Sequence, residues 1–120
     1  MIRRRQHKAE PQLDPLIHPT NRLRVCAALA AAGLVEFSAV QQAVGLSASA
    51  LSKQVHALTG AGYVTQSRGV ADSRRIWLRL TPAGRTAYRS HLAALQALID
   101  ASNQASVGAG SGAEEFDPTL

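Results

Sequence analysis

Residues 67–85 read SRGVADSRRIWLRLTPAGR, and this stretch decides the fold of the 120-residue chain. Two strand-like runs, residues 63–68 and 74–80, flank a short polar turn at residues 69–73, which predicts a β-hairpin. Along the second run apolar residues alternate with basic or aromatic ones, so the strand has an apolar face and a basic face. A concentration of cations favours an anionic partner, and four arginines lie in or beside this hairpin: Arg68, Arg74, Arg75 and Arg79.

Two helical patterns joined by a glycine turn precede the hairpin. The first is expected over residues 39–44, with Ser38 as its cap and Gly45 at its end, because glycine tolerates the left-handed backbone of a tight turn. The second is expected over residues 48–61 and is capped by Ser47. Its inward face carries three residues at helical spacing: Leu51, Val55 and Leu58.

The remaining elements complete the order. A helix is expected over residues 20–32 and a very short strand over residues 35–37. Thr81-Pro82 predicts the start of a last helix that runs to about Asn103, since a hydroxyl cap followed by proline favours the first helical turn. The order helix, strand, helix, helix, strand, strand, helix is that of a winged helix-turn-helix, a mainly α fold with a small β-hairpin (α+β).

The composition along the chain indicates three parts. Residues 1–12 are polar and basic and are expected to form a flexible arm. Residues 13–103 are expected to form one winged helix domain, with the helix over about 82–103 serving dimerisation. Residues 104–120 become rich in glycine, serine and alanine and then acidic, so a disordered tail is expected there.

The charge balance favours nucleic acid as the anionic partner. The formal net charge is +5, and residues 20–91 alone carry nine basic and two acidic side chains. No apolar stretch approaches the ~20 residues of a membrane span, so a cytoplasmic protein without membrane contact is expected.

The residues that most enzymes and metal sites need are scarce. The sequence has no glycine-rich phosphate loop, no His-Glu metal motif and no nucleophile elbow. The single cysteine, Cys26, excludes an internal disulfide and a cysteine-rich zinc site, and it is either a small core residue or a redox switch. Neither catalysis nor a cofactor or metal is expected.

The outward face of the helix over residues 48–61 suits a DNA groove. It holds small or hydrogen-bonding side chains and no acid, which fits the donors and acceptors that base edges present in a major groove. An ordinary solvated helix face is the alternative. The residues expected to contact DNA are Ala48, Ser49, Ser52, Lys53 and His56 in this helix, and Arg68, Arg74 and Arg75 in the hairpin.

Two residues of the hairpin have more than one interpretation. Asp72 is an acid where phosphate would approach, so it is expected to pair with Arg74 or another arginine and hold the turn, or to form an Asx-turn, and the two roles are compatible. Trp77 either stacks on a guanidinium, covers part of a subunit interface, or belongs to the core.

The stretch from Asp72 to Arg75, followed by Leu-Thr-Pro-Ala-Gly-Arg at residues 80–85, resembles the wing and the wing-to-helix junction of the MarR family of bacterial transcription regulators. Residues 46–64 resemble that family's recognition helix and its exit into the wing. Residues 16–24 resemble the opening of small single-domain regulators related to both the MarR and ArsR groups. The resemblance covers about residues 13–100.

The resemblance implies a homodimer that binds a palindromic operator in double-stranded DNA, with Arg74 in the wing tip and Asp72 supporting it. It does not extend to a small-molecule effector pocket, because larger members build theirs with longer terminal helices than residues 81–103 provide. It places these side chains on the face toward the groove: Ser47, Ser49, Ser52, Lys53 and His56.

A second apolar seam lies in the last helix. Tyr88, Leu92, Leu95 and Ile99 are spaced 4, 3 and 4 residues apart, as in helices that pair with another helix. Packing against the helix's own domain is the alternative, but a small domain offers few other surfaces. These four residues, with Leu13 and Leu16 ahead of the first helix, are expected to form the dimer interface.

Together these patterns predict a sequence-specific DNA-binding regulator that acts as a homodimer, with a repressor favoured over an activator. One alternative is a winged helix that binds a partner protein instead of DNA. Another is a nonspecific chromosome-binding protein. The operator, the regulated genes and any inducer do not follow from the sequence.

Overall fold

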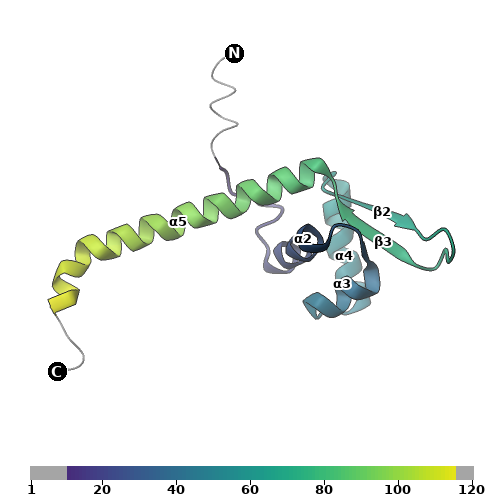
Figure 1. Cartoon of the computed structure of the whole chain (residues 1–120), viewed down its shortest axis with the longest axis horizontal. Helices are drawn as coiled ribbons and strands as arrows, with labels where there is room; N and C mark the ends of the chain where they lie inside the picture. The colour runs from purple at the N-terminus through teal and green to yellow at the C-terminus, as the bar shows by residue number, and fades with distance from the viewer. Residues whose placement is uncertain (1–10, 116–120) are drawn as a thin grey trace, which may run out of the picture.

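The computed structural model describes the backbone of residues 11–115 and the side chains of residues 11–105. The element order confirms the predicted winged helix fold. In Figure 1 three helices gather in one body, a hairpin projects from one end, and the last helix extends far beyond the other. The elements are α2 (Thr20–Ala32), β1 (Val35–Glu36), α3 (Phe37–Val44), α4 (Ala48–Gly60), β2 (Val64–Arg68), β3 (Ile76–Leu80) and α5 (Pro82–Glu115).

The turn between α3 and α4 forms as its residues predict. Gly45 has a left-handed backbone with φ of 72°, and its N–H donates to the Gln41 carbonyl at 2.9 Å. The Ser47 hydroxyl accepts the Ala50 N–H at 3.1 Å and caps α4. This turn fixes the angle at which α4 crosses α3.

The prediction that Ser38 caps α3 is wrong. The helix begins two residues earlier than predicted, at Phe37, and its N-cap is Glu36. Glu36 also belongs to β1 and pairs with Trp77 of β3, so the chain passes directly from the sheet into the helix. Pairing with β3 therefore overrides the local preference of serine for the cap position.

The sheet has three antiparallel strands in the order β1-β3-β2, with β3 in the middle. Its register pairs Val35 with Leu78 on one side of β3 and Thr65 with Arg79 on the other. Leu78 and Leu80 are buried while Arg79 between them is exposed, as the alternation of the sequence predicts.

Helices α2, α3 and α4 and strands β2 and β3 contribute buried residues to one apolar core. Burial of this surface is the main force that stabilises a small domain. Cys26 is part of the core, where burial and then the charge of Asp14 raise the pKa of its thiol to about 11. The buried apolar residues are Ile17, Val25, Cys26, Leu29, Val40, Val44, Leu51, Val55, Leu58, Val64, Leu78 and Leu80.

Helix α5 is longer than the sequence suggested. It runs to Glu115, so the expected end near Asn103 and the disordered tail are wrong for residues 104–115. Alanine is the best helix former and no proline occurs between Pro82 and Pro118, so a few glycines do not end the helix. Residues 116–120 lie outside the described residues.

Of the flexible arm expected over residues 1–12, the structure describes only residues 11 and 12. Residues 1–10 lie outside the described residues. Gln12 is not free, because its N–H donates to the Ser90 hydroxyl of α5 at 2.9 Å. The segment before α2 is therefore attached to α5.

The junction between the wing and α5 depends on close packing of backbone. The Thr81 hydroxyl donates to the Gly62 carbonyl at 2.6 Å and accepts the Gly84 N–H at 2.9 Å, while the Thr81 N–H donates to the Tyr63 carbonyl at 2.9 Å. A Cβ atom at Gly84 would overlap the backbone of Tyr63. The threonine and glycine of the Leu-Thr-Pro-Ala-Gly stretch thus attach α5 to the base of the wing.

We expect Gly84→Ala to destabilise the fold by about 1–3 kcal/mol, because the added methyl group must displace the Tyr63 backbone. The matched control is Gly60→Ala at the end of α4, where an added Cβ meets nothing within 4 Å. The control should change the unfolding free energy by less than about 1 kcal/mol, in the stabilising direction. Urea unfolding of both variants measures the difference, and equal stabilities would contradict this account of the junction.

Candidate nucleic-acid interface

The outward face of α4 has the composition that the sequence predicted. All of its predicted contact residues are exposed: Ser47, Ala48, Ser49, Ser52, Lys53 and His56. On the opposite side Leu51, Val55 and Leu58 are buried. No acidic side chain occurs on α4, so nothing on this helix repels a phosphate backbone.

Two residues that the sequence did not single out hold α4 in place. The Arg22 Nε atom of α2 donates to the Gln54 Oε1 atom of α4 at 2.9 Å, and the Arg22 Nη1 atom donates to the Leu16 carbonyl at 3.3 Å. Both Arg22 and Gln54 are half-buried. Their pairing depends on how α2 crosses α4, which no local pattern reveals.

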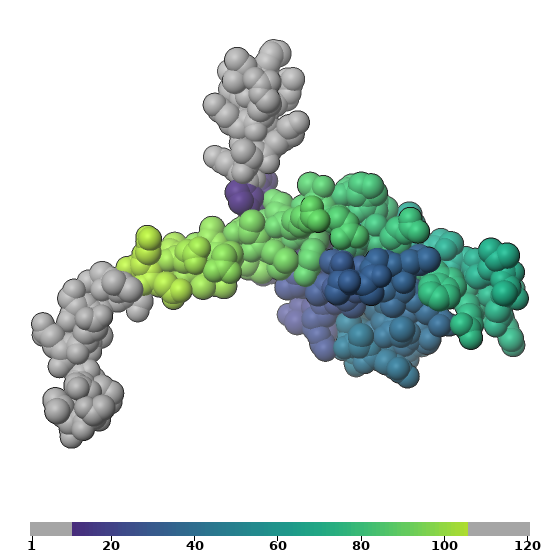
Figure 2. Space-filling view, viewed as in Figure 1, coloured from purple at the N-terminus to yellow at the C-terminus, as the bar shows by residue number. Residues whose placement is uncertain are grey.

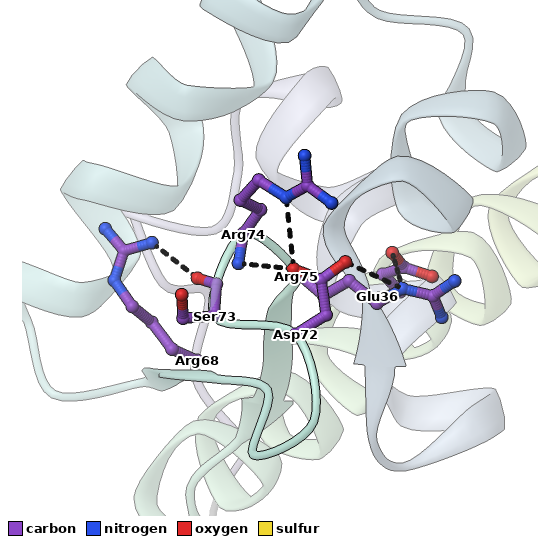
Figure 3. A network of polar contacts seen from close by, with 6 residues as sticks. All are labelled: Glu36, Arg68, Asp72, Ser73, Arg74 and Arg75. Atoms are coloured by element: carbon purple, nitrogen blue, oxygen red, sulfur yellow. Dashed lines mark hydrogen bonds and ion pairs between the residues drawn. The ribbon is translucent and has the colours of Figure 1, made fainter.

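Asp72 organises the turn of the wing. Its Oδ1 atom accepts the Arg74 N–H at 3.0 Å and the Arg74 Nε–H at 3.2 Å (Figure 3). The first bond is an Asx-turn and the second an ion pair, so the two interpretations of Asp72 describe one geometry. The hydrogen bonds from the Arg74 backbone and side chain lower the pKa of the Asp72 carboxyl.

Further contacts close the wing. The Gly69 N–H donates to the Arg75 carbonyl at 2.8 Å, and the Arg75 N–H donates to the Asp72 carbonyl at 3.0 Å. A Cβ at Gly69 would lie 2.6 Å from the Asp72 carbonyl oxygen, so this position requires glycine. The wing turn is therefore a defined structure and not a loose loop.

The three wing arginines differ in the contacts that their side chains already make within the protein. The Arg74 side chain is 90% exposed although it pairs with Asp72. Arg75 lies 3.8 Å from the Glu36 carboxylate and 4.0 Å from that of Asp72, so it braces the wing against β1 (Figure 3). The Arg68 Nη1 atom donates to the Ser73 carbonyl at 2.9 Å. Arg74 is thus more exposed than Arg75, whose side chain is 57% exposed.

Trp77 lies under the wing turn. It is half-buried and does not belong to the apolar core, which excludes the third interpretation of this residue. Its Nε1 atom lies 3.4 Å from the place of a Cβ on Gly69, and it lines a hollow of about 370 Å³ with Val70 and Ala71 at the wing tip.

Helix α4 and the wing strands line the same groove. Ser52 and His56 of α4 share a hollow of about 210 Å³ with Gln66 of β2 and Ile76 of β3. Gln66 and Ile76 also line a second hollow, of about 290 Å³, that continues along β2 to Arg68. The two hollows share Gln66 and Ile76, so together they form a groove from the outward face of α4 along β2 to Arg68, next to the wing turn.

Sequence reasoning missed Gln66 and Ser67 as members of this groove. Residues 65–68 are all exposed, so β2 shows no alternation that would assign one face to the core and the other to the groove. The only available signal was their position immediately before Arg68.

The predicted dimer residues fall into two sets. Leu13, Leu92 and Ile99 are 45%, 40% and 51% exposed, and Leu98 nearby is 56% exposed. Leu16 and Tyr88 are half-buried and pack against the core of their own domain. Leu95 is half-buried.

The division follows from the position of α5. Its first turns lie over the body, whereas the part toward residue 105 stands clear of the body (Figures 1 and 2). There, Leu13 of the segment before α2 lines a surface hollow of about 480 Å³ with Ala94, Ala97 and Leu98 of α5. This apolar surface has no partner among the described residues of the chain.

Residues 11–115 contain neither a cluster of metal ligands nor a helix that could cross a membrane. No three His, Cys, Asp or Glu side chains in this part lie where they could hold a metal ion. Of the helices described there, none combines the length and the apolar character that crossing a membrane requires.

Comparison with known proteins agrees with this geometry. Residues 21–99 match the family model described as a winged helix DNA-binding domain. No curated protein sequence matches the chain. The matched range contains α2 through the wing and most of the described part of α5, so the match covers both elements of the groove.

Three solved structures illustrate the shared fold. A transcriptional regulator homologue from Pyrococcus horikoshii OT3 is 22% identical, with a TM-score of 0.70 over 84% of this chain and 97% of that one. The regulator PcaV from Streptomyces coelicolor, in complex with its natural ligand, is 23% identical, with a TM-score of 0.58 over 99% and 92%. A mutant MarR from E. coli, complexed with operator DNA, is 17% identical, with a TM-score of 0.58 over 76% and 66%.

The wing turn should lose order when Asp72 loses its acceptor atoms. In Asp72→Ala the Arg74 N–H and Nε–H have no partner, so we expect residues 69–75 to become mobile on the nanosecond timescale. Asp72→Asn is the matched control, since its amide oxygen can still accept the Arg74 N–H. Backbone ¹⁵N relaxation measures the difference, and a wing equally rigid in both variants would rule out this role for Asp72.

Proposed function

Because the chain belongs to the winged helix DNA-binding domain family, we propose that it is a sequence-specific transcription regulator that binds a palindromic operator as a homodimer and acts as a repressor. The observation that carries the proposal is the continuous groove formed by α4 and the wing. A duplex that meets the outward face of α4 also meets the strand that leads to Arg68.

In this proposal the polar face of α4 reads the sequence. The first turn, at Ala48 and Ser49, approaches the base edges of the major groove, where hydroxyl groups can donate to or accept from any base. Ser52, Lys53 and His56 follow along the same face. The backbone N–H groups at the start of α4 favour a nearby phosphate.

The wing supplies the part of the affinity that does not depend on sequence. Arg74, whose side chain is 90% exposed, reaches phosphates or the minor groove, and Asp72 holds it in a defined orientation. Arg75 supports this arrangement from within, because its guanidinium already faces two carboxylates. Its predicted role as a direct contact is therefore secondary to its bracing role.

The apolar surface of α5 supports the proposed homodimer. Leu92, Leu98 and Ile99 are exposed on a helix that stands clear of the body, and Leu13 extends the same surface. Pairing two such surfaces removes apolar area from water. It also presents two copies of α4 to successive major grooves, about 34 Å apart, which a palindromic site matches.

An operator that overlaps a promoter would be blocked physically by a bound dimer, which is the repression mechanism proposed here. Such a protein acts in the cytoplasm, on the chromosome. No observation on the described residues favours a small-molecule effector.

The DNA-binding proposal is tested on a duplex selected from genomic fragments, beside a random duplex of equal length. We expect Arg74→Ala to weaken binding to both by about tenfold and to reduce the slope of log affinity against log salt by about one. Ser49→Ala and Lys53→Ala should instead change which sequence is preferred, because they alter base contacts. Fluorescence anisotropy over a range of salt measures all three.

Arg89→Ala is the charge-matched control for this experiment. It removes an exposed arginine of α5 that does not line the groove, so the affinity should stay near that of the parent. Binding that does not depend on salt would contradict the proposal, and equal preference for both duplexes would indicate a nonspecific chromosome-binding protein. No binding to either duplex would favour a protein-interaction module.

The dimer proposal is tested by Leu98→Asp, which places a charge on the exposed apolar surface of α5. We expect a shift from the mass of a dimer to that of a monomer in sedimentation equilibrium, because the charge would have to lose its water in the interface. Leu34→Asp is the matched control, since Leu34 is similarly exposed, at 48%, in the turn between α2 and β1. A monomeric parent protein, or a dimer unaffected by the Leu98 change, would contradict this interface.

A further inference from the structure

His91 is the only buried polar residue among the described side chains, and the interface does not account for it. It lies on α5 with no exposed surface, and its Nδ1 atom accepts the backbone N–H of Asp14 at 2.9 Å. Its Nε2 atom is buried and has no hydrogen-bond partner among the described residues. Because Nδ1 accepts, the neutral ring carries its proton on Nε2.

Asp14 connects His91 to the base of the wing. Its Oδ2 atom accepts the Tyr63 hydroxyl at 2.7 Å, and Tyr63 directly precedes β2. That hydrogen bond, followed by burial, raises the pKa of Tyr63 to about 12, so the phenol is neutral and donates to Asp14. Tyr63 is also the residue on whose backbone Gly84 packs.

Asp14 connects His91 to the recognition helix as well. Its Oδ1 atom accepts the Leu16 N–H at 2.8 Å, and its carbonyl accepts the His18 N–H at 2.8 Å, so Asp14 shapes the turn before α2. The Leu16 carbonyl of that turn accepts from Arg22, which in turn holds Gln54 of α4. The Asp14 joint, defined as Asp14, Tyr63 and His91, therefore joins α5 to both DNA-contacting elements.

Protonation of His91 is incompatible with this geometry. An imidazolium carries a proton on both nitrogens, so Nδ1–H would face the Asp14 N–H and the hydrogen bond between them would be replaced by repulsion. The new Nδ1–H would find its nearest anion in the Asp14 carboxylate, which it could reach only by competing with the Tyr63 hydroxyl.

We propose that His91 is a positioning residue whose protonation opens the Asp14 joint, loosens the base of the wing relative to α5, and so weakens DNA binding in acid. The proposal deepens the proposed function and rests on it for its DNA readout. The step takes up one proton from solvent and forms or breaks no covalent bond other than that N–H.

The titratable groups around His91 are few. His18 lies beside it with ring centroids 5.6 Å apart, and Asp14 lies on the same segment. Cys26 of α2, Tyr63 before β2 and Tyr88 of α5 have raised pKa values, so these three groups remain neutral in weak acid. His18 and Asp14 are the neighbouring groups whose charge acts on the pKa of His91, which His18 lowers and Asp14 raises.

The direction of the pH effect follows from these surroundings. Burial, and then the neighbouring His18, lower the pKa of His91 below its ordinary 6.5, and the charge of Asp14 opposes them only in part. When the joint is open, the pKa of His91 returns to its ordinary value. The open joint therefore binds more protons than the closed joint in weak acid. The closed joint is therefore fully favoured above pH 6.5, loses stability as the pH falls below that value, and loses no more once the pH passes the lowered pKa.

The first test is an NMR titration of the full chain without DNA, from about pH 7.5 to about pH 5. The imidazole nitrogen shifts report the protonation of His91. We expect the amide signals of Asp14 and Tyr63 to move with the same midpoint, which lies below 6.5. Asp14 and Tyr63 signals that stay in place while His91 takes up its proton would overturn the proposal.

The second test compares His91→Asn with His18→Gln. The asparagine oxygen can take the place of Nδ1 and accept the Asp14 N–H but does not titrate, so DNA binding should persist at about pH 7.5 and lose its decline in acid. His18→Gln should keep the decline, because His91 is intact. A decline that persists unchanged in His91→Asn would overturn the proposal. If His91→Asn does not fold, the NMR titration of the parent chain tests the proposal by itself.

The DNA readout is the affinity for the selected duplex, which we expect to be lower at about pH 5.5 than at about pH 7.5 because the closed joint loses stability in acid. Protonation of His56, on the outward face of α4, adds a positive charge toward phosphate and would strengthen binding, so the sign distinguishes the two histidines. An affinity that rises in acid would overturn the proposal. A chain that binds no duplex at any pH would contradict the proposed function, and the titration without DNA would still decide whether the joint opens.

Discussion

The register of β3 is the constraint on which the rest of this structure depends. The strand pairs with β1 on one side and β2 on the other, so it fixes the position of the whole wing relative to the helices. Leu78 and Leu80 must be buried in the core, and a slip by one residue would bring Arg79 there instead. The same register leaves Ile76 at the edge of the groove, beside the outward face of α4.

Contacts within the protein fix the positions of the charged side chains at the interface. Two carboxylates, those of Glu36 and Asp72, face the wing arginines and hold Arg75 and Arg74 in different positions. An acid near a phosphate-binding surface reduces its positive charge, but a rigid turn loses less conformational entropy when DNA binds. This is the physical reason for an aspartate in the wing of a DNA-binding protein.

Sequence patterns predicted the elements whose formation is local. Gly45, Ser47 and Thr81 lie at the helix boundaries that their backbone and capping preferences indicate, and the alternation of β3 is reproduced in its burial. The prediction that Ser38 caps α3 was wrong, because pairing of β1 with β3 moves the start of this helix toward the N-terminus. The extension of α5 through residues 104–115 was missed, because its glycine and serine content suggested a linker where alanine sustains a helix.

The tertiary relations of the site could not be predicted in the same way. Spacing identified an apolar face on α5 but could not reveal that Tyr88 is covered by its own domain and Leu98 is not. The sequence around His91 does not indicate a role for this residue. Its proposed role follows only from the hydrogen bond that its Nδ1 atom accepts from the Asp14 N–H in the folded chain.

The central claim is that α4 and the wing form one surface for DNA. The most direct measurement is the titration of the ¹⁵N-labelled full chain with the selected duplex, following the amide signals of both elements together. The account predicts that Ser49, Lys53 and His56 of α4 shift in parallel with Gln66, Arg68 and Arg74 of the wing and saturate at the same amount of duplex. Shifts confined to one of the two elements, or centred on the C-terminal half of α5, would contradict it.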